Sequence, residues 1–120
     1  MLHMADQPQT SSAFENLASE LRRGLLTLAV LAECSEPQYG YSLKQNLDQR
    51  GLEINEGTLY PLLRRLEEQG LLTSQWQLAD ESRPRRYYVI SPHGQAALAH
   101  LSVEWRQLSR ALDGLLNREE

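Results

Sequence analysis

The chain has 120 residues, a length typical of one domain of about 100–150 residues. Its 41% hydrophobic and 23% charged residues are typical of a globular protein. No apolar run reaches the roughly 20 residues of a membrane span, and the N-terminus lacks a signal-peptide pattern. Cys34 is the only cysteine, which excludes an intrachain disulfide and a cysteine-based zinc site. We therefore expect a cytoplasmic protein without a metal or other cofactor.

The distribution of charge is more informative than its sum. The net charge of −4 argues weakly against a nucleic-acid partner. However, the excess negative charge lies at the chain ends, because residues 21–90 hold nine basic and nine acidic side chains. Eleven of the twelve bases are arginine, whose planar fork suits phosphates and guanine edges. The bases concentrate in Arg83-Pro84-Arg85-Arg86 and in Arg64-Arg65.

Three helices are predicted in the first part of the chain. Residues 1–11 are polar and are expected to be disordered, with Met1–His3 a cloning remnant before Met4. A helical period predicts a helix over residues 12–33, ended by Pro37. Its apolar positions include Phe14, Leu17, Leu21, Leu28 and Leu31. A second helix is expected over residues 41–49, with Gly51 as its C-terminal cap.

The third helix is expected to begin at Asn55, a good N-cap, and to end at Gly70. Pro61 lies past its first turn and is expected to remove one backbone hydrogen bond. The predicted buried stripe consists of Leu59, Leu62, Leu63 and Leu66.

A hairpin and a long helix follow. Residues 72–78 alternate in polarity and residues 86–90 are β-prone, so they predict two strands joined by a charged tip. Ser91-Pro92 is typical of a helix start, and the last helix is expected over residues 94–117, about 35 Å long. Its apolar residues recur at spacings of three and four, the a/d pattern of a coiled coil: Leu98, Leu101, Trp105, Leu108, Leu112 and Leu115.

This order of elements predicts a mainly α (α+β) fold, the winged helix-turn-helix. The winged-helix domain is expected over residues 12–91, including the N-terminal helix, and a long dimerisation helix over residues 92–120. In this fold the third helix enters the major groove, and the hairpin wing reaches an adjacent groove or phosphates. Thr58, in the first turn of the third helix, is placed to meet a phosphate. Tyr60 and Arg64 lie one turn apart. Arg64 and Arg65 are equally consistent with pairing to Glu67 or Glu68, or with exposure to solvent.

The stretch Gly57–Gly70, with the sequence GTLYPLLRRLEEQG, resembles the PadR family of transcriptional regulators. So do Ser82–Tyr88 (SRPRRYY), Ser91–Gly94 (SPHG) and Tyr39–Leu43 (YGYSL). The resemblance covers the chain from about Leu21 to its end, and the combination of Leu-Tyr-Pro with Arg-Pro-Arg-Arg-Tyr-Tyr is specific. This sequence departs from the family in Ser82, where glycine is frequent, and in Ser91, where threonine is frequent.

The resemblance implies a homodimeric repressor of double-stranded operator DNA. It implies a recognition helix over residues 55–69, a wing over residues 76–88 and a single C-terminal dimerisation helix. Some short members have a tryptophan of that helix at the dimer centre, beside a pocket for flat aromatic or cationic compounds. Trp105 stands at the matching position.

Three sets of candidate residues result. The DNA-binding candidates are Tyr41, Lys44, Asn55, Thr58, Tyr60, Arg64, Arg83, Arg85 and Arg86. The dimer-interface candidates are Leu17, Leu21, Leu98, Leu101, Trp105, Leu108, Leu112 and Leu115. A small-molecule effector is expected beside Trp105, Phe14 and Leu17, although Trp105 is equally consistent with packing in the dimer seam.

Enzymatic function has little support. His93 and His100 lack a third ligand at a metal-binding spacing, and no phosphate-binding glycine loop or nucleophile elbow occurs. Cys34 is interpreted as a small buried hydrophobe in preference to a redox sensor. We therefore predict a regulator and not an enzyme. The alternative is a winged-helix protein-interaction module without DNA binding, which the acidic net charge suits.

Overall fold

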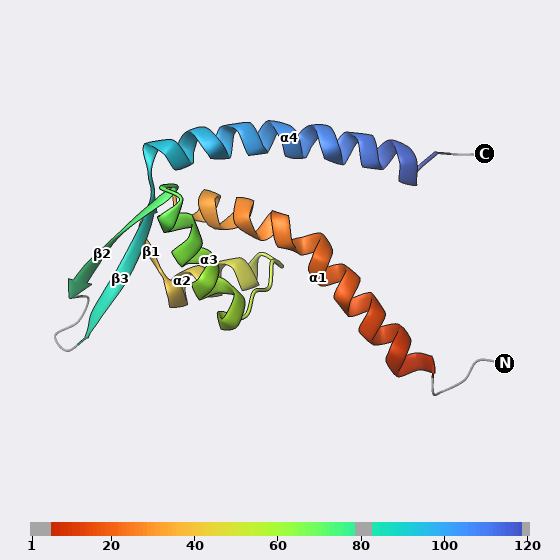
Figure 1. Cartoon of the computed structure of the whole chain (residues 1–120), viewed down its shortest axis with the longest axis horizontal. Coiled ribbons are helices and arrows are strands. Elements are labelled where there is room, and N and C mark those ends of the chain that lie inside the picture. Colours follow the sequence, from red (N-terminus) through yellow and green to blue (C-terminus); the bar gives the residue numbers. More distant parts are fainter. Residues whose placement is uncertain (1–5, 79–82, 119–120) are drawn as a thin grey trace.

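The computed structural model describes residues 6–78 and 83–118, except for the side chains of residues 6–11. Figure 1 shows a helical protein with a small sheet at one side. In chain order, the elements are α1 (Asp6–Glu33), β1 (Gln38–Tyr39), α2 (Gly40–Gln49), α3 (Glu56–Glu68), β2 (Leu72–Leu78), β3 (Pro84–Ile90) and α4 (Pro92–Leu116). The predicted mainly α winged-helix fold is confirmed.

The N-terminal helix is longer than the apolar period predicts. It begins at Asp6, so residues 6–11, for which we expected disorder, belong to α1. Pro8 is compatible with this start, because it falls in the first turn, where backbone N–H groups have no partner within the helix. The expected remnant Met1–His3 lies outside the described residues.

The other helix boundaries follow their predicted caps. Asn55 caps α3, and its side-chain oxygen accepts a hydrogen bond of 2.9 Å from the Thr58 N–H. Ser91 caps α4 in the same way, through a hydrogen bond of 2.9 Å from the Gly94 N–H to its hydroxyl. Gly51 and Gly70, which follow α2 and α3, have the positive φ angles of 87° and 79° that glycine adopts without strain.

The hydrophobic core lies where the C-terminal half of α1, α2, α3 and the sheet meet. The predicted leucine stripe of α3 is buried, and Leu72 and Ile90 cover it from the two strands. Burying one such side chain stabilises the fold by about 1.5–3 kcal/mol. The largest fully buried side chains are Val30, Leu31, Cys34, Leu43, Leu47, Leu59, Leu63, Leu66 and Leu72.

The sheet has three antiparallel strands in the order β1-β3-β2. β2 and β3 pair from Leu72↔Ile90 to Leu78↔Pro84 and form the predicted wing, whose tip, including Ser82, lies outside the described residues. The sequence did not predict β1, in which Tyr39 pairs with Tyr87. Two residues are too few to show the alternation that predicts a strand.

α1 and α4 each expose apolar side chains. The two helices diverge toward the N-terminus of α1 and the C-terminus of α4 (Figure 1). Leu98, expected at a dimer interface, is partly buried and packs against the core of its own chain. The exposed residues, together termed the apolar stripe, are Phe14, Leu17 and Leu21 on α1 and Leu101, Trp105, Leu108, Leu112 and Leu115 on α4.

Alanine at two helical glycines is expected to have opposite effects on stability. A Cβ atom at Gly24 meets nothing within 4 Å, so Gly24→Ala should raise the free energy of unfolding by about 0.5–1 kcal/mol through helix propensity. A Cβ atom at Gly94 meets the Leu71 carbonyl oxygen and the Ile90 side chain, so Gly94→Ala should lower it by about 1–3 kcal/mol. Urea unfolding at one fixed protein concentration measures both changes. A destabilised Gly24→Ala variant would contradict this interpretation.

Candidate nucleic-acid interface

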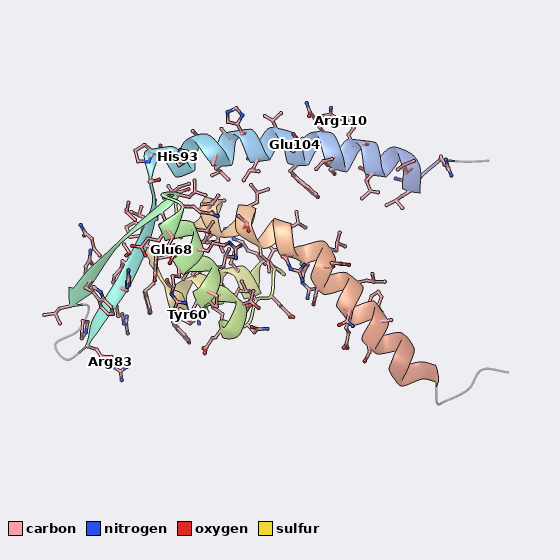
Figure 2. The ribbon with its side chains drawn as sticks, in the orientation of Figure 1. Tyr60, Glu68, Arg83, His93, Glu104 and Arg110 are labelled. Carbon is pink, nitrogen blue, oxygen red and sulfur yellow. The ribbon has the colours of Figure 1, made fainter. Side chains whose placement is uncertain are left out.

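α3 presents one face to solvent because its opposite face is buried. The four buried leucines point into the core, and Tyr60, Arg64 and Glu68 lie on the exposed side. Tyr60 and Glu68 lie near opposite ends of α3 in Figure 2. This exposed face is the part of the helix that can enter a DNA groove.

An aromatic cluster lies beside Tyr60 at the start of α2. A Cβ atom at Gly40 would clash with the Tyr60 ring and hydroxyl, so only glycine allows this close approach of α3 to α2. Tyr39 stacks on Tyr41 with 6.3 Å between ring centroids, and it meets Tyr87 of β3 edge-on at 5.4 Å. Sequence reasoning missed Tyr39 and Gly40 as parts of this surface, although both lie in the segment that resembles the family.

The wing adds arginines to this cluster. The guanidinium of Arg85 lies 4.3 Å from the centroid of the Tyr39 ring, a cation–π contact. This contact uses the face of the guanidinium, so its in-plane N–H donors remain available to a phosphate. Arg83 is exposed and lies at the end of the hairpin remote from α4 (Figure 2).

Arg86 connects the wing to α3 and differs in this respect from the other two wing arginines. It pairs with Glu67 at 3.0 Å and donates to the Ser74 hydroxyl at 2.9 Å, while that hydroxyl donates to Glu67 at 2.6 Å. We expected Arg86 to bind DNA, but its guanidinium is engaged within the protein. Glu67, one of the two glutamates considered as partners for Arg64, therefore pairs with Arg86.

Lys44 connects α2 to the turn before α3. Its ammonium donates to Asp48 at 2.7 Å and to the Ile54 carbonyl oxygen at 2.9 Å, and the other Asp48 oxygen accepts from the Ile54 N–H at 3.2 Å. The hydrogen bond from Lys44 lowers the pKa of the Asp48 carboxyl below its usual value. Lys44 was also expected to bind DNA, but the structure gives its ammonium two partners that fix the start of α3.

A concave surface of about 600 Å³ lies between the wing, α3 and the start of α2. It brings together five of the predicted DNA-binding residues and adds further aromatic rings, and none of its described lining residues is acidic. We term it the wing-side surface. Its lining residues are Tyr39, Gly40, Tyr41, Tyr60, Trp76, Arg83, Pro84, Arg85, Arg86 and Tyr88. Asn55 and Thr58 lie outside it, on the other flank of α3.

The fold agrees with comparisons to known proteins. A profile described as the Transcriptional regulator PadR-like family matches residues 27–100. The chain belongs to the PadR family. It is therefore a PadR-like transcriptional regulator and not an enzyme, and PadR regulators bind DNA.

Individual PadR relatives match most of the chain. Transcriptional regulator Rv3488 of Mycobacterium tuberculosis is 36% identical over 96 residues, 79% of this chain and 89% of that protein. A PadR family regulator from Eggerthella lenta is 39% identical, with a TM-score of 0.84 over 92% of this chain and 98% of its own. A PadR-like regulator from Bacillus cereus is 30% identical, with a TM-score of 0.76 over 84% of this chain and 100% of its own.

The residues predicted to bind an effector do not meet within one PadR chain. Phe14 and Leu17 are 69% and 64% exposed on the half of α1 that diverges from α4, and Trp105 on α4 is 43% exposed. Side chains from a second copy are therefore needed to complete any pocket that includes all three.

Cys34 lies in the hydrophobic core of this PadR chain. Burial raises the pKa of the Cys34 thiol to about 12, so the reactive thiolate is scarce at neutral pH. Among the described residues, no three His, Cys, Asp or Glu side chains lie close enough to hold a metal ion. Within the same ranges, no helix is long and apolar enough to cross a membrane.

Asp48→Asn is expected to destabilise the protein in a pH-dependent manner. The pKa of Asp48 is lowered by folding, so its ion pair stabilises the fold above the usual value of 3.8 and stops doing so as the pH falls through the lowered value. The variant should therefore unfold at lower urea concentrations near neutral pH and approach the wild type in acid. Asp113→Asn on the exposed surface of α4 is the control. A difference between wild type and Asp48→Asn that does not change with pH would contradict this role of Asp48.

Proposed function

We propose that this protein is a homodimeric repressor that binds operator DNA through α3 and the wing, and that a small ligand at the dimer interface lowers its affinity for DNA. The wing-side surface carries this proposal. Its described lining gathers the guanidinium groups of Arg83 and Arg85, the Arg86 guanidinium that pairs with Glu67, and five aromatic rings, in a chain whose net charge is −4. Nucleic-acid backbones are the partners that such surfaces fit best.

In this proposal, the exposed face of α3 occupies the major groove. Tyr60 and Arg64 face the base edges, and Asn55 and Thr58 lie at the helix N-terminus, where backbone N–H groups favour a phosphate. Tyr41, Arg83 and Arg85 contact phosphates from the α2 and wing side. Lys44 and Arg86 hold these elements in position and do not contact DNA.

A second copy is the proposed cover of the apolar stripe. Monomeric proteins rarely expose large apolar patches, and the apolar stripe exposes eight large hydrophobic side chains along the two terminal helices. Pairing of two chains through α1 and α4 removes these side chains from water. It also sets the separation of the two recognition helices, which must be about 34 Å to enter successive major grooves.

The ligand is proposed to bind beside Trp105, with Phe14 and Leu17 of the second copy as neighbours. An indole face suits flat aromatic or cationic compounds. A ligand that binds better to a dimer with a different helix separation shifts the population away from the DNA-binding form. Repression would then be relieved without any contact between ligand and DNA.

Arg85→Ala tests the DNA-binding part of the proposal. Loss of one phosphate contact from each protomer of the dimer should weaken binding to all DNA sequences. It should also reduce the magnitude of the slope of log K against log salt by about 1.8, about 0.9 for each contact. Fluorescence anisotropy with labelled DNA from upstream of the protein's own gene, at several salt concentrations and against scrambled competitor, measures both effects.

Arg110→Ala removes the same charge from the side of α4 turned away from α1 (Figure 2), and it should leave the slope unchanged. An unchanged slope in Arg85→Ala would contradict the wing contact. Equal displacement of the wild type by scrambled and operator DNA would contradict operator recognition itself.

Two substitutions in α4 are expected to separate dimerisation from ligand binding. Leu101→Asp places a charge in the apolar stripe and should give monomers by light scattering, with loss of operator binding. Trp105→Ala should retain the dimer and operator binding but lose the response to planar aromatic cations. A Trp76→Phe background leaves Trp105 as the only indole, so quenching of its fluorescence reports ligand binding directly. A Leu101→Asp dimer, or a Trp105→Ala variant that no longer binds DNA, would overturn these assignments.

A further inference from the structure

A second arginine-lined depression lies on the other flank of α3, between α3 and α1. Its volume is about 330 Å³. It contains three guanidinium groups, from Arg22, Arg23 and Arg65, and one carboxylate, from Glu53. We term it the α1-side pocket. It is also lined by Ser19, Leu26, Thr27, Ile54, Asn55, Thr58, Pro61 and Leu62.

The helical periods of α1 and α3 place the three arginines around an apolar floor. Buried Leu26 and Leu62 form part of this floor, Arg22 is half-buried, and Arg23 and Arg65 are exposed. Arg22 and Arg23 follow Ser19 by three and four residues, so these residues lie on one side of α1. The apolar stripe of α1 lies on another side, so pairing through the stripe leaves this pocket open.

Unlike Arg86, the three arginines of the α1-side pocket form no ion pair with the described side chains. Among the described side chains, those of residues 12–78 and 83–118, the ion pairs join Lys44 to Asp48, Arg50 to Glu33 and Arg86 to Glu67. The pocket therefore keeps an excess of positive charge beside the N-terminus of α3. Three neighbouring guanidinium groups repel one another, and an anion that binds between them relieves this repulsion.

The dimensions of DNA relate this pocket to the wing-side surface. The major groove is about 12 Å wide and an α-helix with its side chains is about 10–12 Å across, so a helix in the groove has a phosphate backbone along each flank. α3 lies between the wing and α1 in Figure 1. The wing-side surface and the α1-side pocket therefore lie on the two flanks of α3. When α3 occupies the major groove, one DNA strand passes each flank.

We propose that Arg22, Arg23 and Arg65 bind a backbone phosphate of the operator strand that passes the α1 flank of α3. This inference rests on the proposed function. It adds three guanidinium groups to the phosphate site proposed at Asn55 and Thr58, which line the same pocket on the opposite side of the recognition helix from the wing. Arg22 and Arg23 precede residues 27–100, to which the family profile extends, and none of the three arginines is among the sequence-based DNA-binding candidates.

The main test compares Arg22→Ala and Arg23→Ala with Arg110→Ala. The first two should each weaken operator binding more than about tenfold at low salt. Each should also reduce the magnitude of the salt slope by up to about 1.8, since the dimer presents one such phosphate site in each protomer, whereas Arg110→Ala should do neither. Arg22→Lys keeps the charge and should keep the slope. Urea unfolding establishes that the variants are folded, and exposed Arg23 serves as the readout if loss of half-buried Arg22 destabilises the protein.

A second measurement locates the contact on the DNA. Neutral methylphosphonate linkages, introduced one at a time into the operator, should weaken wild-type binding at two groups of positions, one on each strand of the groove. At one group, Arg22→Ala should remove the effect of the neutral linkage, while Arg85→Ala should remove it at the other. Loss of both effects in the same variant would overturn the assignment of the two flanks.

The possible outcomes separate this inference from the proposed function. Operator binding by the wild type, with Arg22→Ala and Arg23→Ala indistinguishable from Arg110→Ala, overturns the phosphate site and leaves the repressor proposal standing. Absence of operator binding by the wild type overturns both. Calorimetric binding of inorganic phosphate or pyrophosphate that requires Arg22, without any effect of Arg22→Ala on operator binding, identifies the pocket as a site for free anions and overturns the DNA contact.

Discussion

Burial of four leucines on one side of α3 determines which chemical groups this protein offers to a partner. Leu59, Leu62, Leu63 and Leu66 are at most 5% exposed, so the rotation of the helix about its own axis is fixed by the core. With that rotation fixed, Tyr60 contacts the start of α2 and Arg65 turns toward α1. The polar face of α3 is therefore a consequence of core packing, and the flanking surfaces are arranged around it.

The basic residues around α3 fall into two groups with different roles. Lys44 and Arg86 each pair with a carboxylate and also donate a further hydrogen bond within the protein. They join α2 to the turn before α3, and the wing to α3. Arg83 and Arg85 make no ion pair among the described residues. An ion pair of this kind contributes little to stability where solvent reaches it. The main effect of Lys44 and Arg86 is therefore to fix the relative positions of α2, α3 and the wing.

The sequence predicts the parts of this structure that depend on neighbours along the chain. The leucine period of α3, the caps at Asn55 and Ser91, and the hairpin are all visible as local patterns, and the structure has them. The roles of Lys44 and Arg86 are not visible in this way. Arg86 meets a carboxylate 19 residues away in sequence. The local sequence of a hairpin does not show whether a charged side chain on it pairs with α3 or faces solvent.

The same limit applies to Arg22 and Arg23. They form a dibasic pair as evident in the sequence as Arg64-Arg65, but their helical period only places them on the polar side of an amphipathic helix. Their proximity to Asn55 and Thr58 depends on the packing of α1 against α3. β1 was missed for a related reason, since Gln38 and Tyr39 become a strand only because β3 lies beside them.

The apolar stripe makes the DNA occupancy of such a regulator depend on the concentration of the protein. An isolated chain keeps large hydrophobic side chains in water along two helices, so association is favoured by mass action as soon as the concentration allows it. If the pair is the species that occupies DNA, occupancy at low concentration rises with the square of the number of chains. A regulator that binds DNA as such a pair responds weakly while it is scarce and steeply once it accumulates, so its response has a threshold without any additional component.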